Sequence, residues 1–410
     1  MKTLHRTVLL GALVLGAVLL LVIGCKEDPP ESLFDPSYVS HAQPVLASYT
    51  TIRPNLAGVT IFTFNGSNFS ASADEDIVFF NGTRASVLNA STTQLRVLAP
   101  YIVKDSVIIK IAVKGATMFT DPILYDLKAP TGDFGQWKTL DEAYGLAYGP
   151  DDTLYASLLS GGVGIGVKKI KGDGTRADYS PSFSSAVNKW TSMKFGPGGL
   201  LYTVARNFVF RIPAGGGNAA RWATVSGASS IVDIDFDANN NLWACGTGNT
   251  NIYRVRTSDA NVKPFACAGD MRAVRVYAGY VYVGGLRGTD EKVFRYQIVT
   301  ADSLGAEQEY FNLTSVYGAA GGGIQAMTFN TDGDLYIGTD NAEGIRIVHA
   351  DKTSEALYPG IMLPKNISFA WGNGATLYAS RTGGTVAGVA VTNAIMWINT
   401  LKTGAPTYGQ

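Results

Sequence analysis

Apolar and aromatic positions recur after residue 140 in one pattern: an alternating apolar strand, a polar turn, and a second strand that carries an aromatic residue. In five of six copies, the aromatic residue that ends the first strand lies seven residues before the aromatic residue of the second. A fixed repeat of this kind determines the architecture before any single residue is interpreted. The six copies are Gly145–Ser157, Ser192–Val204, Asp233–Cys245, Ala273–Gly285, Ala326–Gly338 and Ser368–Ser380.

Each repeat continues into further strands. Four antiparallel strands in about 45 residues are typical of a β-propeller blade, so six repeats predict six blades. Third strands are expected at Gly166–Ile170, Phe208–Pro213, Ile252–Arg256, Val293–Gln297, Ile345–His349 and Ile395–Asn399. More polar fourth strands are expected at Arg221–Val225, Lys263–Ala266, Gln308–Asn312 and Glu355–Tyr358.

The sixth repeat has three strands of its own, and only Lys402–Gln410 follows it. The segment Gln136–Leu140 precedes the first repeat, and we predict that it completes the last blade as its fourth strand. A ring closed in this way leaves no free sheet edge. We therefore place a six-bladed propeller at residues 134–410; a seventh blade stays an alternative, although no seventh copy exists to fill it.

The region from Gln43 to Leu127 also has all-β character, and we place a separate domain at residues 41–128. Its apolar stretches are separated by turn signals such as Asn65-Gly66 and Asn81-Gly82. Residues 26–40, with three prolines and four acids, are expected to be a flexible tether. Strands are predicted at Val59–Phe64, Ile77–Phe80, Gln94–Leu98, Val107–Val113 and Met118–Tyr125.

Two stretches in this region carry a family resemblance. Ala57–Ser70 (AGVTIFTFNGSNFS) resembles the opening of IPT/TIG domains, and Ile77–Pro100 follows that family's continuation in order and spacing. The resemblance implies an immunoglobulin-like sandwich, which serves as a spacer or binding unit and is rarely catalytic. Within Val59–Phe64, the alternation does not decide whether the odd or the even residues face the core. The fold class is therefore all-β: an immunoglobulin-like β-sandwich followed by a six-bladed β-propeller.

The later repeats carry a second resemblance. Asp332–Val348 (DGDLYIGTDNAEGIRIV) is close to the consensus of NHL repeats, and residues 237–255 match it more loosely. The repeats as a set resemble NHL and SMP-30/gluconolactonase-like propellers. The other four copies keep the aromatic strand and lose the Asp–Asn pair, so the resemblance identifies the fold more closely than the subfamily.

The N-terminus has the features of a targeting segment. Val8–Ile23 is an apolar run shorter than the roughly 20 residues of a spanning helix. It ends in LVIGC, which resembles a bacterial lipobox, so residues 1–25 are predicted as a signal peptide with Cys25 as the acylated residue. An uncleaved anchor helix is the alternative. The acidic stretch Lys26–Pro30 resembles the export signal of surface lipoproteins, so we expect a lipid-anchored protein of the outer membrane, exposed at the cell surface.

The net charge limits the class of partner, and the position of the two later cysteines argues against a disulfide. The 33 basic and 33 acidic residues cancel and form no basic stripe, which argues against nucleic acid as a partner. Cys245 and Cys267 are expected on strands two apart in one blade, about 9–10 Å from each other. That distance is too long for a disulfide. Both are therefore predicted to be buried apolar residues.

Propeller ligands usually meet the face made by the loops that enter the innermost strand and the loops between the second and third strands; we call this the upper face. Aromatic, amide and arginine side chains around one axis suit a sugar, because rings stack on its apolar side while planar polar groups bind its hydroxyls. The candidate ligand-binding residues are Tyr144, Trp190, Asp233, Arg272, Gln325, Asn366, Arg206, Arg287, Asp340, Asn341 and Arg381.

An enzymatic alternative follows from the SMP-30 resemblance. That family binds a divalent cation through a Glu, two Asn and an Asp in the channel, and Glu142, Asn188, Asp233 and Asn366 would supply such a set, for Ca²⁺ for example. The three histidines lie far from the expected channel, so no Ser–His–Asp set can be assembled. We favour a non-catalytic binding protein without a cofactor, which captures an extracellular glycan or a protein partner, with an outer-membrane transporter as a further partner.

Overall fold

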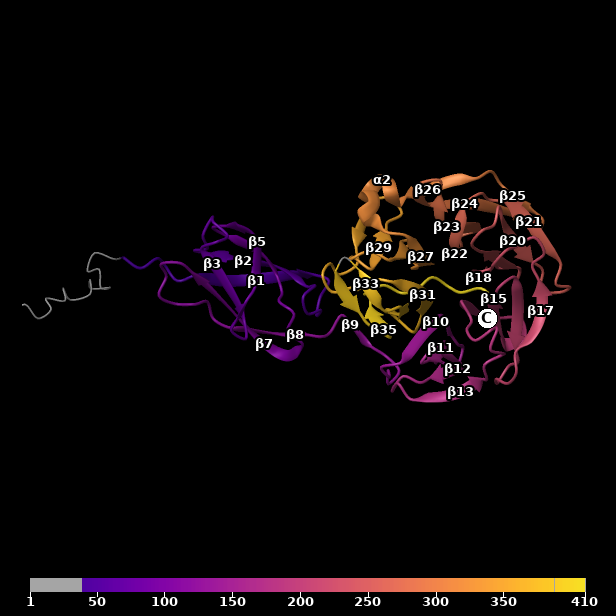
Figure 1. The fold of residues 1–410 in the computed structure, drawn as a ribbon. Coiled ribbons are helices and arrows are strands. Elements are labelled where there is room, and N and C mark those ends of the chain that lie inside the picture. The colour runs from indigo at the N-terminus through magenta and orange to yellow at the C-terminus, as the bar shows by residue number, and fades with distance from the viewer. Residues whose placement is uncertain (1–38, 387, 410) are drawn as a thin grey trace, which may run out of the picture.

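The computed structural model describes residues 39–386 and 388–409, which form two β domains (Figure 1). Among these residues, no helix is long and apolar enough to cross a membrane. Cys25 and most of the predicted tether lie outside the described residues.

The N-terminal domain is a sandwich of two four-stranded sheets. One sheet has the order β1 (Val45–Ile52), β2 (Ile61–Ser67), β6 (Gln94–Leu98), β5 (Ser86–Ser91). The other has the order β4 (Thr83–Arg84), β3 (Asp76–Phe80), β7 (Lys104–Val113), β8 (Ile123–Leu127). The even residues of β2 face the core, since Phe62 and Phe64 are fully buried. Phe62 meets Phe80 of the opposite sheet with ring centroids 5.5 Å apart.

The C-terminal domain is a ring of six sheets, which confirms the predicted six blades (Figure 1). Blade 1 comprises β10 (Asp141–Tyr148), β11 (Leu154–Ser160), β12 (Val163–Ile170) and β13 (Arg176–Ser180). Blade 2 comprises β14 (Ser192–Gly196), β15 (Leu200–Ala205), β16 (Phe208–Ile212) and β17 (Ala220–Thr224), with the 3₁₀ turn η1 (Pro197–Gly199) after β14. Blade 3 comprises β18 (Asp233–Phe236), β19 (Leu242–Cys245), β20 (Asn251–Val255) and β21 (Val262–Ala266).

Blade 4 has a fifth, short strand: it comprises β22 (Asp270–Tyr277), β23 (Tyr280–Arg287), β24 (Asp290–Thr300), β25 (Ser303–Leu304) and β26 (Gln308–Asn312). It is followed by the helix α2 (Leu313–Tyr317) and the 3₁₀ turn η2 (Gly318–Gly321). Blade 5 comprises β27 (Ile324–Phe329), β28 (Leu335–Thr339), β29 (Ile345–Val348) and β30 (Ser354–Ala356). Blade 6 comprises β31 (Asn366–Trp371), β32 (Thr376–Arg381), β35 (Ala394–Asn399) and β9 (Thr131–Asp133), with the hairpin β33 (Gly384–Val386) and β34 (Val389–Val391) inserted before β35.

The repeated aromatic pair has a physical role at the blade junctions. At five junctions, the second-strand aromatic residue of one blade contacts the first-strand aromatic residue of the next. The centroid distances are 4.9 Å for Tyr155–Phe195, 5.0 Å for Tyr202–Phe236, 4.7 Å for Tyr282–Phe329, 5.5 Å for Tyr336–Trp371 and 5.9 Å for Tyr378–Tyr148. At the remaining junction, Trp243 shares an apolar cluster with Val276, the residue that replaces the aromatic in the shorter fourth copy.

The ring closes between sequence from both ends of the domain, but the predicted closing strand was wrong. β9 pairs with β35, with Gly132 opposite Trp397, and Gln136–Leu140 forms no strand. A glycine is required here, because a Cβ at Gly132 would lie 2.8 Å from the indole nitrogen of Trp397. The propeller therefore starts before residue 134, and Trp137 packs nearby against the cluster that contains Ile395.

Two further features position the surfaces considered below. After blade 6, the chain crosses the ring, and the amide of Ala405 donates to the carbonyl of Phe329 at 3.0 Å (Figure 1). The sandwich also contacts blade 5, where the buried Leu56 and Val59 join the cluster that contains Tyr358 and Met362. These apolar contacts join the sandwich directly to the ring.

Candidate functional site

Three of the predicted upper-face residues lie together between blades 4 and 5. The Gln325 amide donates to Asp340 Oδ2 at 3.3 Å, and the Gly323 amide donates to Asp340 Oδ1 at 2.6 Å. Arg272 donates to the Ile324 carbonyl at 2.7 Å and forms an ion pair with Glu291. These groups bind one another, which leaves few polar atoms for a ligand.

A second group lies on blades 1 and 2. The Tyr144 hydroxyl donates to Glu142 at 2.7 Å, and Lys189 Nζ stands 3.8 Å from the centroid of the Tyr144 ring. Desolvation lowers the pKa of Lys189, and the nearby Glu142 carboxylate opposes that shift. The ring face that was predicted to stack on a sugar is therefore covered by an ammonium group.

Trp190 was wrongly predicted as an exposed ring. It is 2% exposed and packs against Phe210 with centroids 4.9 Å apart, because its position just before β14 points it between blades. Asn366 and Arg381 are buried as well. The Asn366 amide donates to the Leu363 carbonyl at 2.9 Å, and Arg381 Nε donates to the Thr392 carbonyl at 2.9 Å. Because all three side chains are buried, a ligand on the upper face cannot reach them, and these three predictions are wrong.

The remaining predicted residues are spread over the ring. Asp233 is buried, and its carboxylate accepts from Ser192 at 2.7 Å and pairs with Arg275 at 2.6 Å. Arg287 pairs with Glu307, and Asn341 Oδ1 accepts from the Glu343 amide at 2.9 Å. Arg206 is exposed and donates to the Ala186 carbonyl at 3.3 Å. The predicted set therefore does not form one continuous binding surface.

Both carboxylates of the alternative metal set are engaged by protein donors. Glu142 is engaged by Tyr144, Asp233 by Arg275 and Ser192, and Asn188 donates to the Gly162 carbonyl at 3.5 Å. Within residues 39–386 and 388–409, no group of three or more His, Cys, Asp or Glu could hold a metal ion. The two cysteines of this region, Cys245 and Cys267, are free and buried, as predicted.

Aromatic and polar side chains do gather at the seam where blade 6 meets blade 1. A cleft of about 460 Å³ lies there, which we call the seam groove. Its residues come from the ring closure, from the turn after β12 and from two strands of blade 6. The seam groove is defined by Asp133, Phe134, Gln136, Asp173, Tyr378 and Trp397.

The three rings of the seam groove are half-buried. Phe134 and Tyr378 meet with centroids 4.8 Å apart at 48°, and Tyr378 stacks on Tyr148 from behind. Burial raises the pKa of the Tyr378 hydroxyl, which therefore stays a hydrogen-bond donor at neutral pH. Trp397 lies over Gly132, with no hydrogen bond from its indole nitrogen to any described residue.

Polar groups border these rings. Gln136 and Asp173 are exposed, and Asp133 is 64% exposed with Arg381 3.8 Å away. The sequence analysis missed this site because it placed the closing strand at Gln136–Leu140, whereas the closing strand is β9 and residues 134–136 border the groove. One signal was available in the sequence. Trp397 is an aromatic residue on the third strand of the sixth repeat, and that repeat has no fourth strand of its own to cover it.

Comparison with known proteins supports the fold. Residues 44–126 match the family model described as IPT/TIG domain. A putative phosphatase from Bacteroides thetaiotaomicron VPI-5482 aligns over 89% of this chain and 98% of its own, with 12% identity and a TM-score of 0.55. The calcium-binding protein regucalcin from Agrobacterium tumefaciens str. C58 aligns over 68% of this chain and 94% of its own, with 11% identity and a TM-score of 0.52.

An auxiliary nutrient binding protein from B. thetaiotaomicron VPI-5482 aligns over 89% of this chain and 98% of its own, with 12% identity and a TM-score of 0.48. No curated protein matches the sequence. At identities of 11–12%, the putative phosphatase and regucalcin show the likeness of fold alone. The chain thus consists of an immunoglobulin-like IPT/TIG domain followed by a six-bladed β-propeller.

Proposed function

We propose that this protein is a lipid-anchored, surface-exposed protein of the outer membrane that captures an extracellular glycan in the seam groove without turning it over. The observation that carries the proposal is the set of half-buried rings, Phe134, Tyr378 and Trp397, bordered by exposed polar side chains. Aromatic faces stack on the apolar side of a pyranose, and amide and carboxylate groups bind its hydroxyls.

The arrangement of the chain fits this role. The LVIGC motif at Cys25 would carry the lipid, and the sandwich stands between that anchor and the ring. The sandwich meets blade 5 through Leu56 and Val59, and Arg53 forms an ion pair with Glu355 across the same contact. A ring held in this way would be presented away from the membrane by a spacer of defined orientation.

Binding is favoured over catalysis by what surrounds the candidate residues. The carboxylates of Glu142, Asp233 and Asp340 are engaged by protein donors. A glycan needs no activated nucleophile for capture, only a shelf that is partly desolvated. The seam groove supplies such a shelf.

The test is a glycan array on the full-length chain in detergent, followed by calorimetry with the best glycan. Replacing Trp397 by Ala should weaken glycan binding at least about tenfold, because a central aromatic anchor carries a large share of the binding energy. Trp222→Ala is the matched control, since Trp222 is a half-buried tryptophan on β17 outside the groove. Equal affinities for the two variants would rule out the seam groove as the site.

The anchor has a separate test. Cells fed an alkyne-labelled fatty acid should label the wild-type protein and leave Cys25→Ala unlabelled. External protease should cleave the wild-type protein on intact cells, because surface exposure puts the tether outside the outer membrane. Labelling of Cys25→Ala, or full protection in intact cells, would contradict the proposed location.

A further inference from the structure

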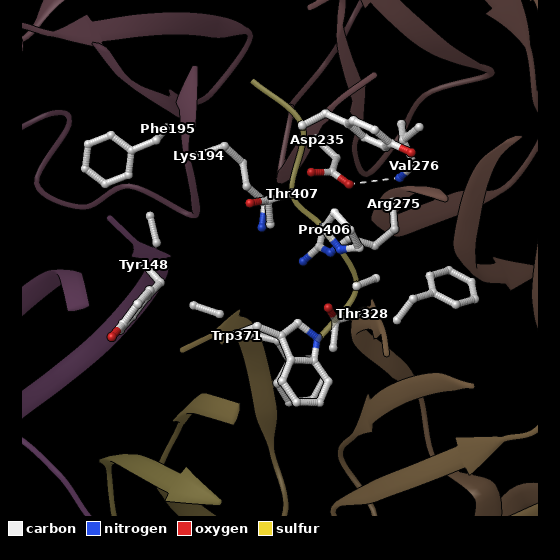
Figure 2. Close-up of a pocket in the computed structure, with 16 residues that line it drawn as sticks. Tyr148, Lys194, Phe195, Asp235, Arg275, Val276, Thr328, Trp371, Pro406 and Thr407 are labelled. Atoms are coloured by element: carbon white, nitrogen blue, oxygen red, sulfur yellow. Dashed lines mark hydrogen bonds between the residues drawn. The ribbon is translucent and has the colours of Figure 1, made fainter. Parts of the chain in front are cut away.

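The central channel contains a ring of equivalent residues that the proposed function does not use. Each innermost strand contributes the residue that precedes the repeated first-strand aromatic, or Val276 in the fourth repeat. These residues line a cavity of about 100 Å³, part of which Figure 2 shows. Four consecutive blades supply polar side chains, and the other two supply alanine. The six residues are Ala147, Lys194, Asp235, Arg275, Thr328 and Ala370.

The C-terminal segment covers this cavity. Ala405–Tyr408 forms part of the cavity wall, and Figure 2 shows Pro406 and Thr407 beside Lys194 and Arg275. We call Gly404–Tyr408 the strap. It is fixed at one end by the hydrogen bond from Ala405 to Phe329, and Tyr408 packs on core residues of blades 2 to 4 at the other end. The cavity is therefore closed on this side by a segment that belongs to none of the blade strands.

Polar atoms of the cavity lack protein partners. Asp235 and Arg275 are 8% and 6% exposed, and Asp235 Oδ2 accepts from the Val276 amide at 2.8 Å. Within the described part of the chain, the Lys194 ammonium and the Thr328 hydroxyl make no hydrogen bond or ion pair. The Trp371 indole nitrogen is buried and has no partner either. A buried donor such as this indole N–H is costly unless something accepts from it.

The numbers of hydrogen-bond donors and acceptors in the cavity indicate which kind of ligand would fit it. Lys194, Thr328 and Trp371 all present donors, and Arg275 adds a second cation. The carboxylate of Asp233 is already engaged by Arg275, Ser192 and two backbone amides, so it offers little to a ligand. Among the residues that line the cavity, Asp235 is the one acid that faces the Lys194 ammonium. The cavity therefore contains more hydrogen-bond donors than acceptors.

We propose that the channel cavity binds a small oxyanion or short carboxylate, held by Lys194, Thr328 and Trp371 and covered by the strap. The volume admits only a few heavy atoms, so this ligand is not the glycan of the seam groove, and the site does not depend on the proposed function. An anion that keeps one proton, such as dihydrogen phosphate, would also donate to Asp235. Burial lowers the pKa of Lys194 to about 8, so its side chain remains cationic at neutral pH.

Calorimetry on the full-length chain in detergent at pH 7 tests the site, with inorganic phosphate and acetate as probes and chloride to match ionic strength. The expected result is saturable binding of at least one probe with one site per chain. Lys194→Met should weaken it at least tenfold, whereas Lys171→Met, at an exposed lysine of blade 1, should leave it unchanged. If neither probe binds the wild-type chain, the cavity holds water only and the proposal is wrong.

Two further variants keep the test decisive if Lys194→Met fails to fold. Thr328→Val removes one hydroxyl at nearly constant volume and should also weaken the anion. Gly404→Val should speed anion exchange, because a Cβ at Gly404 would lie 2.2 Å from the Trp371 ring and displace the strap. Unchanged affinity in Thr328→Val together with unchanged exchange in Gly404→Val would overturn the site. Trp397→Ala, which tests the seam groove, should keep full anion affinity.

Discussion

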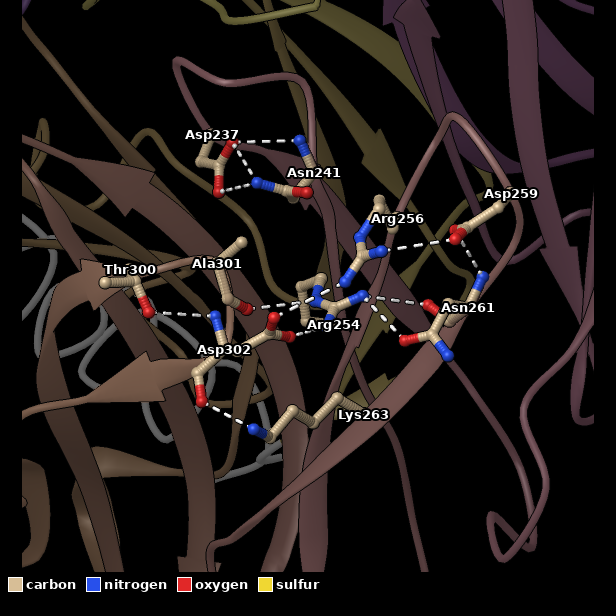
Figure 3. Close-up of polar contacts among 10 residues, drawn as sticks. All are labelled: Asp237, Asn241, Arg254, Arg256, Asp259, Asn261, Lys263, Thr300, Ala301 and Asp302. Atoms are coloured by element: carbon tan, nitrogen blue, oxygen red, sulfur yellow. Dashed lines mark hydrogen bonds and ion pairs between the residues drawn. The ribbon is translucent and has the colours of Figure 1, made fainter.

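Two buried arginine networks lie in neighbouring blades and differ in how completely the protein satisfies them. At the rim of blade 3, Arg254 is fully buried and donates to the carbonyls of Ala301 and Asn261, both at 3.0 Å (Figure 3). It also pairs with Asp302, whose backbone carbonyl accepts from Lys263 at 2.6 Å. In the channel, Arg275 is buried beside Asp233, while the neighbouring Lys194 has no such partner among the described residues.

The difference separates a structural network from a candidate ligand site. The rim network joins the turn between β24 and β25 of blade 4 to the outer strands of blade 3. The short strand β25 pairs with β24 directly after this turn, which Arg254 fixes through the Ala301 carbonyl. The channel network faces a cavity. Burial of charge alone therefore does not identify a site; donors that the protein leaves unpaired do.

The largest expected effect is at the rim. Arg254→Met should lower the free energy of unfolding by about 3 kcal/mol, because removing one partner of a buried network leaves its acceptors unpaired. Urea denaturation would measure the change. Arg256→Met is the matched control, since Arg256 also contacts Asp302, at 3.4 Å, but its side chain is 37% exposed; it should cost less than about 1 kcal/mol. Equal losses would mean that burial does not distinguish the two arginines.

The channel lysine should behave in the opposite way. Lys194→Met should raise the free energy of unfolding by about 1–2 kcal/mol in anion-free buffer at pH 7, because it removes a half-buried, partly desolvated cation without a hydrogen-bonded partner among the described residues. The groups that face Lys194 are Asp233, Asp235 and Arg275; the two acids oppose the desolvation cost and the arginine adds to it. A loss of stability in Lys194→Met would show that the ammonium is well paired after all.

The pH dependence of this difference has a defined sign. The pKa of Lys194 falls from 10.5 in the unfolded chain to about 8 in the folded protein, so between these values the unfolded state binds more protons. The wild type should therefore gain stability relative to Lys194→Met as pH rises from about 8 toward 10.5, and the gap between them should be constant below pH 7. Lys171→Met, at an exposed position, should show no such change relative to the wild type.

The blades could be predicted from the sequence because the signal is local and repeated. The two aromatic residues of one repeat lie seven apart, and the second of them meets the first aromatic of the next repeat across the blade junction, as Tyr202 meets Phe236, so each copy carries the same packing requirement. Lys194 and Asp235 lie one residue before the first-strand aromatics Phe195 and Phe236, so the residues that line the channel can be identified from the sequence once the blades are known. The sequence repeat does not predict the cavity, the strap that covers it, or the donors that lack a protein partner.

The residues of the closing strand and the seam groove could not be predicted for a physical reason, although closure by the N-terminal end of the propeller was predicted. β9 has three residues in a segment with proline and glycine, so it lacks an alternating pattern, and its pairing with Trp397 is long-range. Trp190 was misassigned because the position before an innermost strand can point to solvent or between blades. The choice depends on neighbours such as Phe210, which the sequence does not place beside it.

The smallest expected effect concerns the acid of the rim network. Asp302→Asn should lower the free energy of unfolding by about 1 kcal/mol or less, since this side chain is 50% exposed and exposed pairs contribute little. Arg254 keeps the carbonyls of Ala301 and Asn261 and the side chain of Asn261 as acceptors. Asp259→Asn, which removes the other partner of Arg256, is the surface control. High salt should reduce the Asp302→Asn effect further, because salt screens exposed charges. A loss near that of Arg254→Met, unchanged by salt, would mean that Arg254 is stabilised by the ion pair and not by the carbonyls, which would remove the basis for contrasting it with Lys194.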